Sequence, residues 1–79
     1  MNKESDNLDS FLKFRIEFGI KLRECRRSKN LTLVDLALMC ETDSSYIGKI
    51  ERGEISVGLD SLNKILTALD IQLITAIFK

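Results

Sequence analysis

The polar side chains of residues 42–53, TDSSYIGKIERG, are the ones in this chain best placed for chemistry. Ser45 and Lys49 are four residues apart, so on a helix they share one face and could form a serine–lysine nucleophile. The chain has no histidine to act as a general base, and its acidic residues form no evident pair. The same spacing suits a helix face that binds a ligand, and we therefore predict a binding protein rather than an enzyme.

Metal and membrane functions have little support in the composition. Cys25 and Cys40 are the only cysteines, and without histidine they cannot complete a zinc site. We expect both to be reduced residues in or near the core, with no metal, cofactor or small-molecule effector. No apolar run approaches the roughly 18 residues of a membrane span, and no signal-peptide pattern is present. We therefore predict a cytoplasmic protein, bacterial or phage-encoded, with no membrane partner.

Charge is segregated along the chain although the net charge is zero, with 12 basic and 12 acidic residues. The first ten residues hold Glu4, Asp6 and Asp9 against Lys3. Residues 21–29 contain a single acid, Glu24, among the bases Lys21, Arg23, Arg26, Arg27 and Lys29. Because phosphate binding depends on local rather than total charge, this distribution is compatible with a nucleic-acid-binding face.

The first half of the chain predicts a flexible tail followed by one long helix. Residues 1–8 are polar without periodicity, whereas from Asp9 or Ser10 apolar residues recur at helical spacing to about Ser28. These residues share one face: Phe11, Phe14, Phe18, Leu22 and Cys25. Gly19 costs a helix about 1 kcal/mol relative to alanine, which indicates a close packing contact or a slight break. Lys29 and Asn30 form the turn, with Asn30 able to adopt a left-handed conformation.

The middle of the chain predicts two short helices. Thr32 is a suitable N-cap for an apolar stripe made by Leu33, Leu36, Ala37 and Cys40. Asp43 caps the next helix, in which Tyr46, Ile47 and Ile50 are spaced for burial, and Gly53 is its stop signal. Only about three residues separate the two helices, which indicates a helix-turn-helix.

A fourth helix is predicted from Gly58 or Leu59 to about Asp70, which closes one domain of residues 9–70. The fold class is all-α, a compact bundle of four to five helices. Residues 71–79 fit either a short helix or a strand, and their β-branched and aromatic residues favour the strand. We expect this tail and the fourth helix to form a homodimer interface from Leu59, Ile65, Ile71, Leu73, Ile74, Ile77 and Phe78.

Residues 18–71, about two-thirds of the chain, resemble the Cro and lambda-repressor type of DNA-binding domain, the XRE family. Four stretches together carry the resemblance: LRECRR, LTLVDLA, SSYIGKIERG and SLNKILTALDI. It implies a lambda-repressor-like bundle whose third helix enters the major groove of DNA. Within the family, such small proteins are similar to restriction-modification controllers, phage repressors and antitoxins of the HipB type.

The resemblance also implies roles for individual residues. Ser44, Ser45 and Lys49 would face base edges, with Tyr46 at the border of that surface. The residues expected to contact phosphate are Arg23, Arg27, Lys29, Thr32, Asp43 and Arg52. Arg26 and Glu51 would form a structural salt bridge between the first and third helices. Two positions depart from the family pattern: Leu33 stands where a glutamine commonly contacts DNA, and Glu41 where a glycine makes the turn.

Together these features predict a sequence-specific transcriptional regulator that binds double-stranded operator DNA as a homodimer, reading two half-sites related by a two-fold axis. An antitoxin that binds a toxin protein and represses its own operon is an alternative with the same fold. A protein-interaction module that has lost DNA binding is a second alternative, because the net charge is zero.

Overall fold

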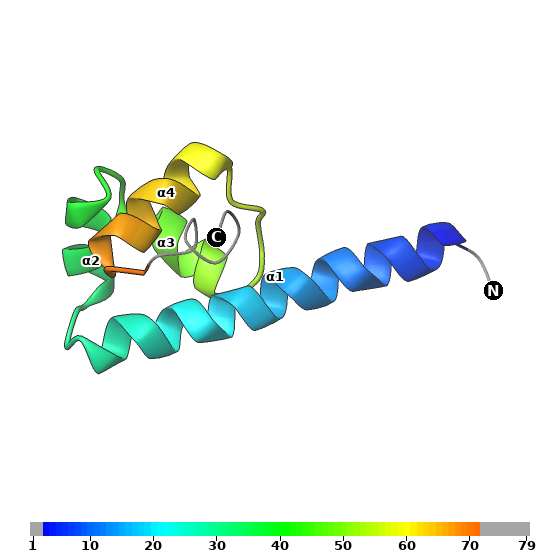
Figure 1. Cartoon of the computed structure of the whole chain (residues 1–79), viewed down its shortest axis with the longest axis horizontal. Helices are drawn as coiled ribbons and strands as arrows, with labels where there is room; N and C mark the ends of the chain where they lie inside the picture. The colour runs from blue at the N-terminus through cyan, green and yellow to red at the C-terminus, as the bar shows by residue number, and fades with distance from the viewer. Residues whose placement is uncertain (1–2, 72–79) are drawn as a thin grey trace, which may run out of the picture.

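The computed structural model describes residues 3–71, which form four helices and no strand. The helices are α1 (Lys3–Ser28), α2 (Leu33–Met39), α3 (Ser44–Glu51) and α4 (Leu59–Ala68). The three shorter helices gather at the C-terminal half of α1, and the N-terminal half of α1 projects away from them (Figure 1). The predicted all-α fold is confirmed. The expected strand or helix of the tail lies, apart from Ile71, outside the described residues.

The start of α1 differs from the prediction. The helix begins at Lys3 rather than at Asp9 or Ser10, so residues 3–8, expected to be a flexible tail, are helical. The sequence of this segment lacks an apolar stripe, but a helix that is already nucleated further along the chain can propagate by one backbone hydrogen bond per added residue. The C-terminal end of α1 at Ser28 agrees with the prediction.

The core is formed by one apolar face from each helix. Its buried residues are Leu22, Leu36, Ala37, Cys40, Ile47, Ile50, Ile65 and Leu69. Phe18 and Cys25 pack against this cluster from α1. Phe11 and Phe14 continue the same helix face but are 69% and 68% exposed, because the helix extends past the other three. The apolar face predicted for the first helix therefore serves the core only over its C-terminal half.

Gly19 lies where α1 crosses the end of α3. A Cβ at this position would be 2.4 Å from the Glu51 carbonyl oxygen and 2.5 Å from the Ile50 carbonyl oxygen. Any side chain would therefore push the two helices apart, and the close contact predicted at Gly19 is confirmed.

All four helices end in the same way. In each case a residue with positive φ follows the C-cap: Asn30 (57°), Glu41 (57°), Gly53 (72°) and Asp70 (58°). The next amide donates back to a carbonyl in the last turn, as in a Schellman motif: Leu31 to Arg26, Thr42 to Ala37, Glu54 to Lys49 and Ile71 to Leu66, at 2.8–3.2 Å. These motifs satisfy carbonyl groups that the helix itself leaves unpaired.

The residues expected at a dimer interface do not share one environment. Ile65 is 1% exposed and belongs to the core of the single chain, so its predicted role in the interface is wrong. Leu59 and Ile71 are 82% and 38% exposed and stay available to a partner. The structure does not describe Leu73, Ile74, Ile77 and Phe78.

Over residues 3–71, none of the four helices combines the length and apolar character that crossing a membrane requires.

Candidate nucleic-acid interface

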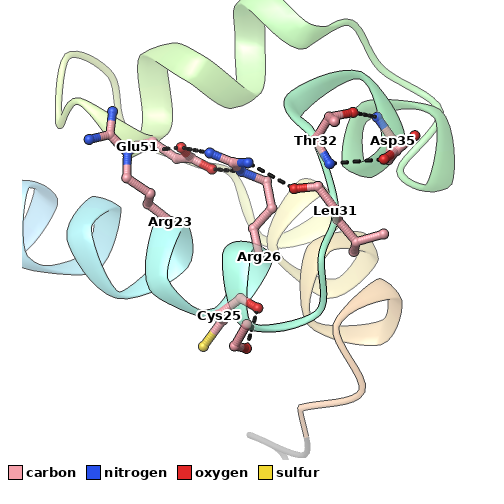
Figure 2. Close-up of polar contacts among 8 residues, drawn as sticks. Arg23, Cys25, Arg26, Leu31, Thr32, Asp35 and Glu51 are labelled. Carbon is pink, nitrogen blue, oxygen red and sulfur yellow. Dashed lines mark hydrogen bonds and ion pairs between the residues drawn. The ribbon is translucent and has the colours of Figure 1, made fainter.

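The start of α2 is fixed by a reciprocal pair of hydrogen bonds. The Thr32 hydroxyl accepts from the Asp35 amide at 3.0 Å, and the Asp35 carboxylate accepts from the Thr32 amide at 2.9 Å (Figure 2). The predicted N-cap Thr32 is confirmed, and Asp35 completes a capping box with it that was not predicted. The Thr32 amide and, to a lesser degree, its hydroxyl lower the pKa of the Asp35 carboxyl below its usual value.

The start of α3 is fixed by Asp43, whose carboxylate accepts from the Tyr46 amide at 2.8 Å. The turn before it passes through Glu41 at a φ of 57°, the left-handed conformation expected where the family has glycine. Thr32 and Asp43, both expected to contact phosphate, therefore use their side chains to cap helices. A phosphate contact at either position would fall to backbone amides at the start of α2 and α3.

One face of α3 is buried and the other is open. Ile47 and Ile50 are buried in the core. Ser45 and Lys49, one helical turn apart, are exposed, while Ser44 and Tyr46 are half-buried at the margins. The exposed face therefore carries a hydroxyl and an ammonium group, which can hydrogen-bond to base edges or phosphate.

A buried ion pair joins the end of α1 to the end of α3. The Arg26 Nε donates to Glu51 Oε2 at 2.6 Å, and the Arg26 Nη2 donates to Glu51 Oε1 at 2.9 Å (Figure 2). The side chains of Arg26 and Glu51 are 8% and 1% exposed. Arg26 also donates to the carbonyl of Leu31 at 2.9 Å. The Glu51 carboxylate, mainly through its hydrogen bonds, raises the pKa of the Arg26 guanidinium above its ordinary value. The predicted structural salt bridge has the geometry expected of it.

Arg23 joins the same cluster, which the sequence analysis missed. Its Nε lies 3.4 Å from Glu51 Oε1, and its side chain is 48% exposed (Figure 2). The spacing of three residues between Arg23 and Arg26 places both on one side of α1 and could have signalled this contact. Arg23 therefore stays about half exposed to solvent while it shares its charge with Glu51.

The other predicted phosphate-binding side chains are accessible. Arg27 and Lys29 are exposed at the end of α1. Arg52, just after α3, is exposed and pairs with Glu54. Over residues 3–71, no group of three side chains is arranged to bind a metal ion.

The two short helices α2 and α3 form a helix-turn-helix in which both helices are capped and α3 has an open polar face. A buried ion pair also joins α3 to α1. These features define a class of DNA-binding domain. Residues 22–74 match the helix-turn-helix family model, and the chain belongs to this family of the XRE type. The chain is 44% identical over 59 residues to the control protein C.BamHI of Bacillus amyloliquefaciens, covering 73% of each protein. It is also similar to the crystal structure of the restriction-modification controller protein C.AhdI from Aeromonas hydrophila. That match has a TM-score of 0.75 and 41% identity, and covers 77% of this chain and 88% of that one. The chain is thus a DNA-binding regulator of transcription.

Proposed function

We propose that this chain is a controller-type regulator that binds, as a homodimer, to an operator of two half-sites related by a two-fold axis. The observation that carries the proposal is its identity of over 40% to two controller proteins across about three-quarters of its length. The exposed face of α3 supports the proposal, because the side chains expected to read DNA are not buried in the protein core.

In this function Lys49 reads a base. An exposed lysine can donate to the O6 and N7 acceptors of guanine in the major groove, while Ser45 bonds to a neighbouring base or phosphate. Ser44 and Tyr46, half-buried at the margins, would contact the DNA only at the edge of this surface. Arg27, Lys29 and Arg52 would hold the domain on the backbone and fix its register without reading sequence.

Dimerisation adds a second recognition helix, which binds the second half-site of the operator. One short helix makes few base contacts, so two linked copies gain both affinity and a longer recognition sequence. Leu59, the first residue of α4, and Ile71, just after its end, are both exposed and would contribute to the dimer together with the tail residues Leu73, Ile74, Ile77 and Phe78. No catalytic step is part of this function.

The proposal is tested by selecting binding sites from random duplex DNA with the purified chain at two salt concentrations. We expect a two-fold-symmetric site whose affinity falls steeply as salt rises, because bound cations release counterions from DNA. Failure to enrich any sequence at low salt would contradict the proposal and turn attention to a protein partner such as a toxin.

Two variants then separate base reading from backbone binding. We expect Lys49→Ala to weaken binding to the selected site by about 1–3 kcal/mol and to relax preference at one base pair. Arg27→Ala should weaken binding to all sequences alike and reduce the salt dependence. Uniform losses across sequences for Lys49→Ala would remove its role as a base-reading residue.

A further inference from the structure

The open face of α3 continues past the last residue of the helix to Arg52. This residue follows Ser45 by seven positions and Lys49 by three, so the three side chains lie on one side of the helix. Arg52 is the C-cap and keeps helical backbone angles, with a φ of −86° and a ψ of 0°. The open face therefore carries a guanidinium in addition to the hydroxyl and ammonium groups.

The Arg52 side chain lies back along α3 over Gly48. A Cβ at Gly48 would be 3.0 Å from Arg52 Nη1, 3.8 Å from Cζ and 3.9 Å from Nη2. Long side chains on a helix point toward its N-terminus, and the absence of a Cβ lets this guanidinium come close to the backbone one turn earlier. Gly48 thus provides the space in which the guanidinium lies.

Glu54 binds the same guanidinium. Arg52 Nε donates a hydrogen bond to Glu54 Oε2. The backbone of Glu54 is itself held in place, because Gly53 turns the chain with a φ of 72° and the Glu54 amide donates to the Lys49 carbonyl at 3.0 Å. The carboxylate is therefore carried by a turn that is attached to the end of α3.

This contact leaves the end of the Arg52 side chain available to DNA. Within residues 3–71 the hydrogen bonds of the guanidinium involve Nε alone, so Nη1 and Nη2 can still bind the two oxygens of a phosphate. Because the pair of Arg52 and Glu54 has no net charge, it attracts distant DNA less than a free arginine would.

Folding stability does not account for the pair. The side chains of Arg52 and Glu54 are 52% and 49% exposed, and exposed ion pairs contribute little to the free energy of unfolding. Its effect is on the position and the charge of a side chain that faces the DNA.

We propose that Glu54 is a specificity-determining residue that acts through Arg52 without contacting DNA. Non-specific binding depends on the charge that a protein presents to phosphates in any register, and a neutral pair adds little to it. On the operator, a guanidinium already held over Gly48 contacts its phosphate without losing the side-chain freedom that a mobile arginine would lose. Glu54 therefore favours the operator over other DNA. The inference rests on the proposed function, because it requires α3 to lie in the major groove.

The main test measures the specificity ratio, which is the affinity for the selected operator divided by that for an unrelated duplex. Glu54→Gln keeps the size of the side chain and removes its charge. We expect the variant to bind the unrelated duplex more tightly and with a steeper dependence on salt. Because one arginine in each half-site is released, its specificity ratio should fall by at least about threefold.

Glu17→Gln is the matched control, since it makes the same change of charge at an exposed position of α1. Gly19 faces α3, and a residue two positions earlier lies about 200° round the helix, so Glu17 is on the side away from α3. This variant should keep the specificity ratio of the wild type.

A double-variant cycle tests whether Glu54 acts through Arg52. In an Arg52→Ala background, Glu54→Gln should no longer change the specificity ratio, because repulsion between a free carboxylate and phosphates affects all sequences alike. Gly48→Ala changes the same guanidinium by another route, since its Cβ would displace Nη1. Its specificity ratio should fall although the protein is at least as stable as the wild type, which a general structural defect would not produce.

Four results would overturn the inference alone. They are an unchanged specificity ratio in Glu54→Gln, an unchanged ratio in Gly48→Ala, an equal fall in Glu17→Gln, and a fall on Glu54→Gln that persists in the Arg52→Ala background. A wild-type chain that prefers no sequence would instead overturn the proposed function and this inference together.

Discussion

Gly19→Ala adds one methyl group at the crossing of α1 and α3. The new Cβ would lie 2.4 Å and 2.5 Å from two backbone carbonyl oxygens, those of Glu51 and Ile50. Because neither oxygen can rotate away, the helices must separate by several tenths of an ångström. That movement would also strain the contact between Arg26 and Glu51, since it joins the same two helices.

The expected cost follows from two opposing terms. Overpacking a core typically costs about 1–3 kcal/mol, and two rigid contacts place Gly19 near the upper end. Alanine in place of glycine returns about 1 kcal/mol of helix propensity. We therefore expect Gly19→Ala to lower the free energy of unfolding by about 2 kcal/mol and, in a domain of this size, to lower Tm by about 8–16 °C.

Gly48→Ala is the matched control, because it makes the same substitution in a buried helical position. Its Cβ would meet only the end of the Arg52 side chain, with Nη1 at 3.0 Å, and that side chain can move. We expect this variant to be more stable than the wild type by up to about 1 kcal/mol. Urea unfolding followed by circular dichroism measures both. A Gly19→Ala variant as stable as the wild type would show that α1 and α3 are not in close contact.

Three further predictions concern other parts of the fold. Arg26→Met should lower the free energy of unfolding by about 3–5 kcal/mol, because the Glu51 carboxylate stays buried without its main partner. Adding Glu51→Leu should restore part of that loss in urea unfolding, and strictly additive costs would contradict the pairing. The lowered pKa of Asp35 means that its contribution to stability is present at neutral pH and lost as pH falls through that pKa. The stability difference between wild type and Asp35→Ala should accordingly shrink in acid, and a constant difference would exclude the capping box as its source. Burial raises the pKa of the Cys40 thiol, although nearby Lys64 opposes this, so a thiol reagent should modify half-buried Cys25 well before Cys40. Equal rates would show that the core opens readily.

Local chemistry made the helix-turn-helix predictable from the sequence. Thr32 and Asp43 cap their helices as their types and positions indicate, because a side-chain oxygen before an apolar run can accept from a first-turn amide. Asn30 adopts the left-handed conformation expected of it. The partnership of Arg26 with Glu51 came from the resemblance to the family, since nothing in the spacing of residues 26 and 51 specifies a contact.

Features that depend on how the helices pack against one another were harder to predict from the sequence. Ile65 and Leu59 both belong to the apolar pattern of α4, but only the packed structure shows that the first is buried and the second exposed. The polar start of α1 could not be recognised as helix from the sequence, because residues 3–8 carry no apolar periodicity. Phe11 and Phe14 were predicted to lie on the same helix face as Leu22, but the sequence does not tell where that face leaves the core. The base and phosphate contacts stay predictions.

The four similar helix ends are positions where substitutions can raise the stability of the protein. Of the four left-handed positions at the helix ends, only that of Gly53 must be glycine, because Ile16 Cα would lie 3.0 Å from any Cβ placed there. Asn30, Glu41 and Asp70 hold the same left-handed conformation with side chains, and at Glu41 this costs about 1 kcal/mol that glycine would recover. Stability can therefore be gained at turns, away from the core and from the open face of α3. Such a gain would offset destabilising substitutions on α3, so the operator preference could evolve without unfolding the domain.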